Sequence, residues 1–334
     1  MITINKILGV ITATAILAFA LEAAQANRGR AQLAYVSNER DGTITVINTA
    51  TDEVVSSIQV GGRLRGIHLS ADGKTLYVAL TYRSDQRESA TDKIVAIDAA
   101  TKRVVASYDA GSDPEQFAIS RDGARLYASN EDAGTASITD LRTNRVIATL
   151  VVGIEPEGVA ISPDGRWVYV TSESSSNVSV IDTRTNKIKA TFPVGARPRA
   201  AAFTPDGLRA YVTAENGGTV AVVSTRDHKV TNTIQLPRDQ VKPMGVVVSP
   251  DGRRVYVANG RGNNVAVIDA RTNKVETLIP VAARPWGIAI TRDGRKVYTA
   301  NGLSNDVAVI DTATNRVIKT VKAGDGPWGI VISR

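Results

Sequence analysis

Residues 158–194 read GVAISPDGRWVYVTSESSSNVSVIDTRTNKIKATFPV, and this stretch decides the fold. The segment GVAIS runs into Pro-Asp-Gly, a strong turn signal, and RWVYVTSE follows with alternating β-branched and aromatic residues. NVSVID and IKATFPV have the same strand character and are separated by the turn TRTNK. The stretch therefore predicts four short antiparallel strands joined by turns.

This unit repeats along the chain. Tyrosine stands five residues after an Asp-Gly pair in six units, and Tyr35 opens the same pattern near the N-terminus. The Asp-Gly pairs begin at intervals of 42 to 50 residues, at Asp72, Asp122, Asp164, Asp206, Asp251 and Asp293. A period of about 40–45 residues with several strands per unit is typical of β-propellers. The chain is therefore expected to be all-β.

Two fragments complete the repeat count. Residues 35–60 supply the second to fourth strands of a blade, and PWGIVIS at 327–333 supplies a first strand. Joined, they make a seventh blade and leave no exposed sheet edge in the ring. We predict a seven-bladed β-propeller with four antiparallel strands per blade. It is closed by the C-terminal strand pairing with the three N-terminal strands, in a single domain over residues 27–334.

Residues 1–26 are expected to be a signal peptide. Lys6 precedes the uncharged stretch ILGVITATAILAFAL at 7–21, and the small-residue pattern Ala-Gln-Ala follows at 24–26. Fifteen residues at about 1.5 Å each extend about 22 Å, less than the roughly 30 Å core of a bilayer. We therefore expect cleavage after Ala26, export to the periplasm, no membrane span in the processed chain, and a monomer.

The composition excludes several kinds of chemistry. The chain has no Cys and two His, which leaves no disulfide, thiolate zinc site, iron–sulfur cluster or C-x-x-C-H haem attachment. It contains no nucleophile elbow, phosphate loop or helical metal motif. We expect His68 to pack on an inner strand and His228 to be solvated in a turn. The sequence predicts no catalytic residues and no required cofactor.

The blade ends opposite the Asp-Gly turns are expected to form a binding mouth. A proline introduces most first strands there, and the residue after it is expected to point towards the central opening. These positions, one per blade, are Arg65, Glu115, Glu157, Arg199, Met244, Trp286 and Trp328. Further candidates flank the prolines or follow second strands: Arg197, Arg284, Asn130, Glu131, Glu173, Glu215, Asn259 and Asn301. Mixed charges and two indoles favour a recognition site, although the charges could simply pair around the ring.

One blade carries a longer loop on the same face. Residues 81–92 add eight residues relative to the other blades and include Tyr82 and Arg83. A lid or partner contact and a tolerated surface insertion both remain open.

The opposite, turn-bearing ends hold many Lys and Arg residues within a net charge of +7. Docking to nucleic acid or another polyanion is one interpretation. We favour a ring of solvated turns, because no aromatic residues interleave with the charges for base stacking. Asp residues that end the third strands are expected to accept hydrogen bonds from turn amides and to be structural: Asp98, Asp140, Asp182, Asp269 and Asp311.

The repeat units YVTSESSSNVSVIDTRTNKIKATFPVG and YVANGRGNNVAVIDARTNKV resemble the YVTN-type β-propeller repeat. The order of DPEQFAISRDG, EPEGVAISPDG, ARPRAAAFTPDG and PWGIVIS is similar to propeller proteins associated with pyrroloquinoline quinone-dependent alcohol catabolism. This resemblance implies a periplasmic propeller that accompanies quinoprotein dehydrogenases and transport components. It implies no catalytic residues. Leu64, in place of the usual proline, and the 81–92 insertion depart from the pattern.

Three functions follow as hypotheses. The favoured one is a non-catalytic binding or scaffold propeller that recognises a small anion, such as pyrroloquinoline quinone, or a partner protein at the mouth. The second is a lactonase- or lyase-like enzyme assisted by a Ca²⁺-like cation, with Glu115, Glu157, Glu131 and Glu173 as candidate ligands. The third is polyanion or DNA binding by the basic turns, whose signature is a steep salt dependence.

Overall fold

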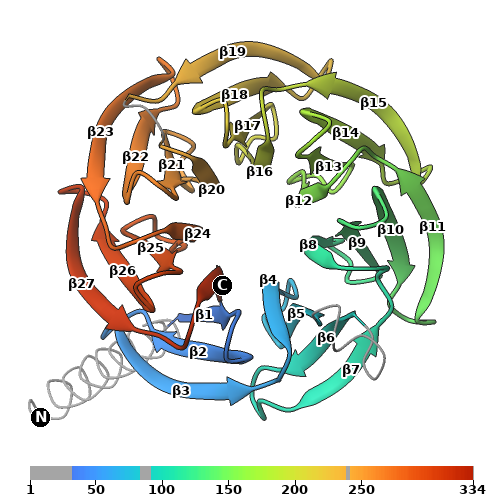
Figure 1. Ribbon diagram of the computed structural model, residues 1–334, viewed down its shortest axis with the longest axis horizontal. Coiled ribbons are helices and arrows are strands. Elements are labelled where there is room, and N and C mark those ends of the chain that lie inside the picture. The colour runs from blue at the N-terminus through green and yellow to red at the C-terminus, as the bar shows by residue number, and fades with distance from the viewer. Residues whose placement is uncertain (1–31, 83–91, 238–240, 334) are drawn as a thin grey trace, which may run out of the picture. The chain divides into compact units, whose positions relative to one another are not determined.

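The computed structural model describes residues 32–82, 92–237 and 241–333. The expected signal peptide, Arg83 and most of the longer loop lie outside these residues. Seven four-stranded antiparallel sheets form the blades of a ring (Figure 1). The predicted fold class is therefore confirmed. Within the described residues, no helix has the length and apolar character needed to cross a membrane.

The strands follow in chain order, with the innermost strand of each blade first. The blade that joins the two ends of the ring contains β28 (Pro327–Ile332), β1 (Leu33–Asn38), β2 (Thr43–Asn48) and β3 (Glu53–Gln59). The second blade contains β4 (Arg63–Leu69), β5 (Thr75–Thr81), β6 (Lys93–Asp98) and β7 (Val104–Tyr108). The third contains β8 (Pro114–Ile119), β9 (Arg125–Asn130), β10 (Thr135–Asp140) and β11 (Arg145–Val151). The fourth contains β12 (Pro156–Ile161), β13 (Trp167–Ser172), β14 (Asn177–Asp182) and β15 (Lys187–Pro193). The fifth blade contains β16 (Pro198–Phe203), β17 (Arg209–Ala214), β18 (Thr219–Ser224) and β19 (Lys229–Gln235). The sixth contains β20 (Pro243–Val248), β21 (Arg254–Asn259), β22 (Asn264–Asp269) and β23 (Lys274–Pro280). The last contains β24 (Pro285–Ile290), β25 (Lys296–Asn301), β26 (Asp306–Asp311) and β27 (Arg316–Lys322).

The ring closes as the sequence predicts. Strand β28 pairs with β1 in antiparallel register, with Ala34 opposite Ile332. The Ser333 amide donates a 2.8 Å hydrogen bond to the Leu33 carbonyl, and the Leu33 amide bonds the Ser333 hydroxyl. Pairing the two ends of the chain in one sheet leaves no gap between the first and last blades.

The repeated tyrosines are core residues that lock neighbouring blades together. Tyr169, Tyr211 and Tyr298 are fully buried on second strands. The Tyr211 hydroxyl contacts the Asn273 side chain at 3.2 Å, and the Tyr298 hydroxyl contacts Asp52, each in the third-to-fourth-strand turn of the next blade. Each ring thus buries apolar surface, and its hydroxyl forms a hydrogen bond with a side chain of the adjoining sheet.

The Asp residues of the turns have the structural role that the sequence predicts. Asp164 accepts hydrogen bonds from the Ser162 hydroxyl at 2.5 Å and the Arg166 amide at 3.0 Å, and Gly165 adopts a φ of 75°. At the end of a third strand, Asp269 accepts the amides of Arg271 at 3.0 Å and Thr272 at 2.6 Å. These carboxylates therefore hold the turns in place.

His228 is buried, so the expectation that it is solvated is wrong. Its Nδ1 lies 2.8 Å from the Tyr169 hydroxyl, and its ring packs edge-on against Trp167 with centroids 4.7 Å apart. Burial lowers the pKa of His228. The residue occupies the turn position at which Asn273 bonds Tyr211 in the next blade, with a φ of 53°. A turn position that looks exposed in the sequence is covered because the neighbouring blade packs over it.

Candidate functional site

A β-bulge aims one side chain per blade at the mouth. In the fourth blade, Pro156 pairs with Ser172 and Val159 with Val170, so Glu157 and Gly158 fall in a register shift between them. The register shifts near the start of all seven innermost strands. In six of them the shift follows the first residue, a proline, and in β4 it follows the second residue, Leu64. Bulges redirect side chains out of the sheet. The seven predicted mouth residues occupy these bulges.

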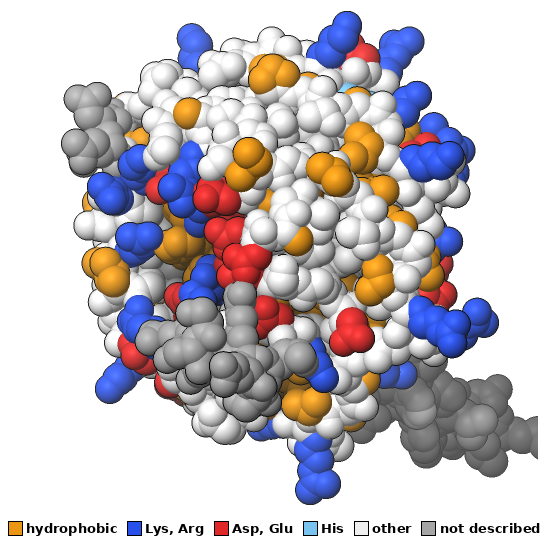
Figure 2. Space-filling model, turned by 45° about the vertical axis from the view of Figure 1, so that its right-hand side comes forward, with side chains coloured by type: hydrophobic (Ala, Val, Ile, Leu, Met, Phe, Trp, Pro, Cys, Tyr) orange, Lys and Arg blue, Asp and Glu red, His pale blue; other side chains and the backbone are white. Residues whose placement is uncertain are grey.

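The residue after the mouth position is glycine in five blades, and Gly158 shows why. A Cβ on Gly158 would lie 2.1 Å from the Arg199 carbonyl oxygen of the next blade. The innermost strands therefore approach one another closely enough for mouth side chains of adjacent blades to touch. Figure 2 shows Asp and Glu side chains grouped beside a hollow in the protein surface, with Lys and Arg side chains around it.

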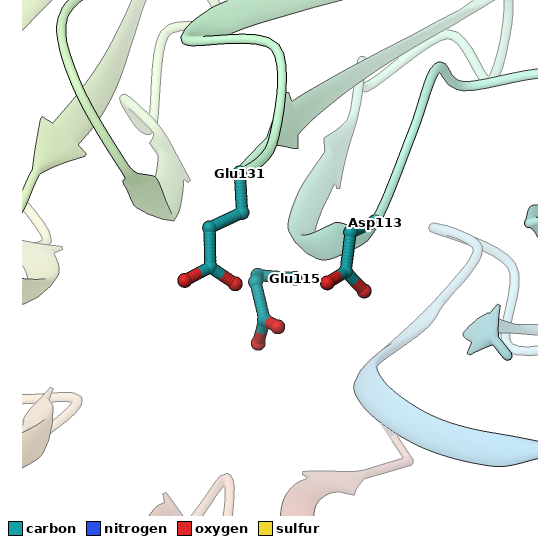
Figure 3. Close-up of side chains that lie close together, drawn as sticks. All are labelled: Asp113, Glu115 and Glu131. Atoms are coloured by element: carbon teal, nitrogen blue, oxygen red, sulfur yellow. The ribbon is translucent and has the colours of Figure 1, made fainter. Parts of the chain in front are cut away.

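Three carboxylates converge on one side of the mouth (Figure 3). Asp113, Glu115 and Glu131 each place one carboxylate oxygen within 4.8 Å of the others. Glu115 is fully buried, and its Oε1 receives no hydrogen bond within the described part of the chain. Burial and the nearby Glu157 raise the pKa of Glu115 well above its usual value. Burial also raises the pKa of Glu131.

Arg65 lies between this acidic group and the aromatic side of the mouth. Its Nη1 donates a 2.5 Å hydrogen bond to Glu115, and its Nε lies 3.4 Å from Glu39. Its guanidinium carbon lies 5.6 Å from the centroid of the Trp328 ring. The nearby carboxylates hold the pKa of Arg65 above its usual value despite burial. Arg65 is therefore a fixed cation that compensates part of the acidic charge.

A second ion-pair group lies across the adjacent blades. Arg199 is 7% exposed and pairs with Glu157 at 3.2 Å, with Glu173 and with Glu215 at 3.7 Å. Arg197 reaches Glu173 at 2.7 Å and Glu215 at 3.0 Å. These contacts agree with the alternative expectation from the sequence, that charges at the mouth pair with one another around the ring. Glu157 and Glu173 are held by arginine and do not join Glu115 and Glu131 in one cation site.

Two tryptophans form the remaining side. The rings of Trp286 and Trp328 lie 5.8 Å apart, and Trp286 lies between the guanidinium groups of Arg199 at 5.2 Å and Arg284 at 4.8 Å. A cavity of about 310 Å³ is lined by both tryptophans together with Arg284. Met244 is buried at 3% exposure.

A smaller cavity of about 170 Å³ lies along the innermost strands and is lined by backbone of the bulge glycines and by His68 and Gln116. His68 packs edge-on against Phe117 with centroids 4.9 Å apart, in agreement with the expected packing role. Burial lowers the pKa of His68 to about 4, so the imidazole is neutral at physiological pH.

Three other sequence candidates serve the blades themselves. Asn130, Asn259 and Asn301 are at most 1% exposed. Their side-chain amides donate to Thr135 at 3.3 Å, to Asn264 at 2.8 Å and to Asp306 at 2.7 Å, in each case five residues further along the same blade. These asparagines tie second strands to third strands and have no surface for a ligand.

Of the two named lid residues, Tyr82 falls within the described residues and Arg83 does not. It is half-buried and packs against the apolar core near β4 and β5, and its amide donates a 2.9 Å hydrogen bond to Asp92. At this point the longer loop is therefore anchored to its blade. Arg83 and the lid role itself are not tested.

Sequence reasoning missed Asp113 as a member of the acidic group and Glu39 as the partner of Arg63 and Arg65. Glu39 has the repeat position of Glu131, immediately after a second strand, which is a signal available in the sequence. Asp113 precedes Pro114 and adopts a φ of 49°. That backbone conformation, which the sequence does not reveal, places Asp113 in the same group as Glu115 and Glu131.

The fold and the mouth define a seven-bladed β-propeller with a charged mouth flanked by tryptophan. Residues 182–328 match the lactonase family of seven-bladed β-propellers, and residues 86–202 match the cytochrome D1 haem domain. Each match spans less than half of the chain. No match was found among curated proteins.

Solved structures of similar fold include a hydrazine synthase from Kuenenia stuttgartiensis. It is 22% identical with a TM-score of 0.73 over 84% of this chain and 92% of that one. Candidate 6-phosphogluconolactonases from Bacteroides uniformis and Bacteroides fragilis are 18% and 19% identical, both with a TM-score of 0.76. The alignments cover 91% and 92% of this chain and 100% and 99% of theirs. At these identities the likeness establishes the fold alone, and it gives the quinoprotein association no support.

Proposed function

We propose that this propeller is a cation-assisted hydrolase that opens a cyclic ester, with Asp113, Glu115 and Glu131 as the cation ligands. The observation that carries the proposal is the convergence of these three carboxylates within 4.8 Å at the mouth. The lactonase-family match over residues 182–328 supports the reaction class. That match does not include the three carboxylates, so the site rests on geometry.

The site fits a hard divalent cation. All three ligands are carboxylates, which Ca²⁺ prefers, and Glu115 Oε1 is buried without a hydrogen bond in the described chain. The raised pKa of Glu115 reflects burial and repulsion from Glu157. A bound divalent cation would relieve this repulsion. A bound cation would supply Lewis acidity for the ester carbonyl.

The chain's own residues would bind and orient the substrate. Arg65 is fixed at 2.5 Å from Glu115 and at 3.4 Å from Glu39, so its guanidinium keeps one orientation beside the carboxylates. It would stabilise the negative charge that develops on the carbonyl oxygen when water attacks. Arg199 holds Glu157 at 3.2 Å next to the same group and keeps that carboxylate in place.

The test uses purified protein, Ca²⁺ and the simple lactones D-glucono-1,5-lactone and γ-butyrolactone. We expect Ca²⁺ binding by calorimetry and lactone hydrolysis that is lost on chelation. Glu115→Gln should weaken Ca²⁺ binding at least tenfold and abolish hydrolysis. Glu53→Gln, which removes a carboxylate 68% exposed on an outer strand, is the matched control. Absence of Ca²⁺ binding and of hydrolysis would overturn the proposal, while binding without hydrolysis would overturn the enzymatic part.

The sequence resemblance supports a second proposal, that the protein acts in the periplasm as a monomer beside quinoprotein alcohol oxidation. In this case the mouth would bind a dehydrogenase, a transport component or the quinone cofactor. Arg65, Arg197 and Arg199 are all paired with glutamates, which leaves less positive charge at the mouth for a small anionic ligand than the sequence alone predicts. Cell fractionation tests the location, and mass spectrometry of protein from its own periplasm tests the partner.

A further inference from the structure

The described residues give Arg284 no ion-pair partner, although its counterpart Arg197 has one. Both residues precede the proline of an innermost strand and have similar backbone conformations, with φ values of 59° and 58°. Arg197 pairs at 3.0 Å with Glu215, which follows the second strand of its own blade. The residue at that position in the blade of Arg284 is Gly302. Within the described residues, Arg284 has no ion pair.

Arg284, which has no ion pair within the described part of the chain, borders the cavity of about 310 Å³ between the first and last blades. Two other cations also line it, but both are neutralised: Arg40 pairs with Asp325 at 2.7 Å, and Arg65 pairs with Glu39 and Glu115. The surplus charge of the cavity is therefore positive and is centred on Arg284. Such a site favours an anion.

Part of the cavity wall is apolar, beside the charged side chains that also line it. Trp286 is half-buried, and Leu303 is 64% exposed although its neighbours form the mouth. Trp328 also lines the cavity, and its buried Nε1 has no hydrogen-bond partner within the described chain. The accessible part of Trp286 and the exposed leucine beside it offer apolar area against which a ring system can pack.

We propose that this cavity binds an organic carboxylate with a flat ring system. The carboxylate would pair with Arg284, and the rings would lie against the tryptophans and Leu303. The proposal does not depend on lactone hydrolysis, because the cavity lies on the Trp328 side of Arg65, whereas the three carboxylates lie on the Glu115 side.

The probe is 2-naphthoate, and isothermal titration calorimetry of the purified protein without added metal is the measurement. We expect saturable 1:1 binding. The neutral isostere 2-naphthamide should bind at least tenfold more weakly, because it cannot form the ion pair with Arg284. Arg284→Gln should weaken 2-naphthoate binding at least tenfold. A second variant, Leu303→Ser, should weaken it severalfold and leave the preference for the acid over the amide intact.

Two controls make the test specific. Arg197→Gln removes the paired counterpart, and Arg295→Gln removes a side chain that is 84% exposed in an Asp-Gly turn; both should change affinity less than twofold. Circular dichroism melting of each variant verifies folding. The proposal is overturned if 2-naphthoate does not bind at millimolar concentration. It is also overturned if the amide binds as well as the acid, or if Arg284→Gln and Arg295→Gln behave alike.

Discussion

The Arg65 guanidinium is held against the fully buried Glu115 carboxylate by a 2.5 Å hydrogen bond that joins two neighbouring blades. This contact lies at the mouth, between β4 and β8. On one side Arg65 faces Trp328, and on the other Glu115 faces Glu131 and Asp113. The stability of the propeller and the chemistry of the mouth therefore share one residue pair.

Replacing Arg65 by Met should destabilise the protein by about 3 kcal/mol, because it removes both the buried hydrogen bond between two blades and the cation that stabilises the charged form of Glu115. Urea denaturation at pH 7 measures the change. The matched control is Arg40→Met, since Arg40 and Asp325 are 39% and 48% exposed and such pairs contribute less than about 1 kcal/mol. Equal losses for the two variants would contradict the central role of the Arg65–Glu115 pair.

The raised pKa of Glu115 predicts a specific pH dependence. Glu115 retains its proton in the folded state at pH values where the unfolded chain releases it, so its contribution to stability falls as pH rises above its usual pKa. We expect the stability difference between Glu115→Gln and the parent protein to grow in favour of the variant from pH 4.5 to pH 8. Urea denaturation across this range measures it. Millimolar Ca²⁺ at pH 8 should reverse the trend for the parent protein alone, and a pH-independent difference would argue against a buried protonated Glu115.

His228→Asn should be tolerated within about 1 kcal/mol. Asn273 has the same turn position in the next blade, adopts a φ of 56° and contacts Tyr211 as His228 contacts Tyr169. His228→Val should cost about 2–3 kcal/mol, because a β-branched residue is strained at positive φ and cannot bond the buried hydroxyl. Thermal melting compares the two variants. Similar melting temperatures for both would show that neither backbone conformation nor the tyrosine contact matters here.

Gly158→Ala should destabilise the protein by about 1–3 kcal/mol through overpacking. Its new Cβ would lie 2.1 Å from the rigid Arg199 carbonyl. Gly217→Ala is the control, because its nearest neighbour is the Thr219 hydroxyl at 3.2 Å, which can rotate away. Chemical denaturation distinguishes the two. A neutral Gly158→Ala would mean that the innermost strands can separate.

Much of this protein was predictable from local pattern. The 42- to 50-residue spacing of Asp-Gly pairs, the tyrosine five residues later and the split final blade led to the seven-bladed ring and its closure, both of which the structure confirms. The structural role of Asp269 followed from turn chemistry in the same way. These features depend on residues close together in sequence, so periodicity and propensity are enough to identify them.

The partners at the mouth were not predictable. Residue type suggested that Glu157 and Glu173 could bind a cation with Glu115 and Glu131, but Arg199 of the next blade takes both. Asp113 joins the acidic group instead, and His228 is covered by a neighbouring blade.

The sequence by itself determined the architecture and the set of side chains that face the mouth, because a repeat places equivalent residues at equivalent positions. Only the tertiary structure decided which of them are neutralised and which remain free to bind. Which charges pair depends on the direction of each bulge and on close contacts between neighbouring blades. The residues in contact lie some 40 residues apart in the chain, so a local sequence pattern does not predict their pairing. Arg197 and Arg284 share a position and a backbone conformation, yet among the residues that the structure describes only Arg197 pairs with a glutamate.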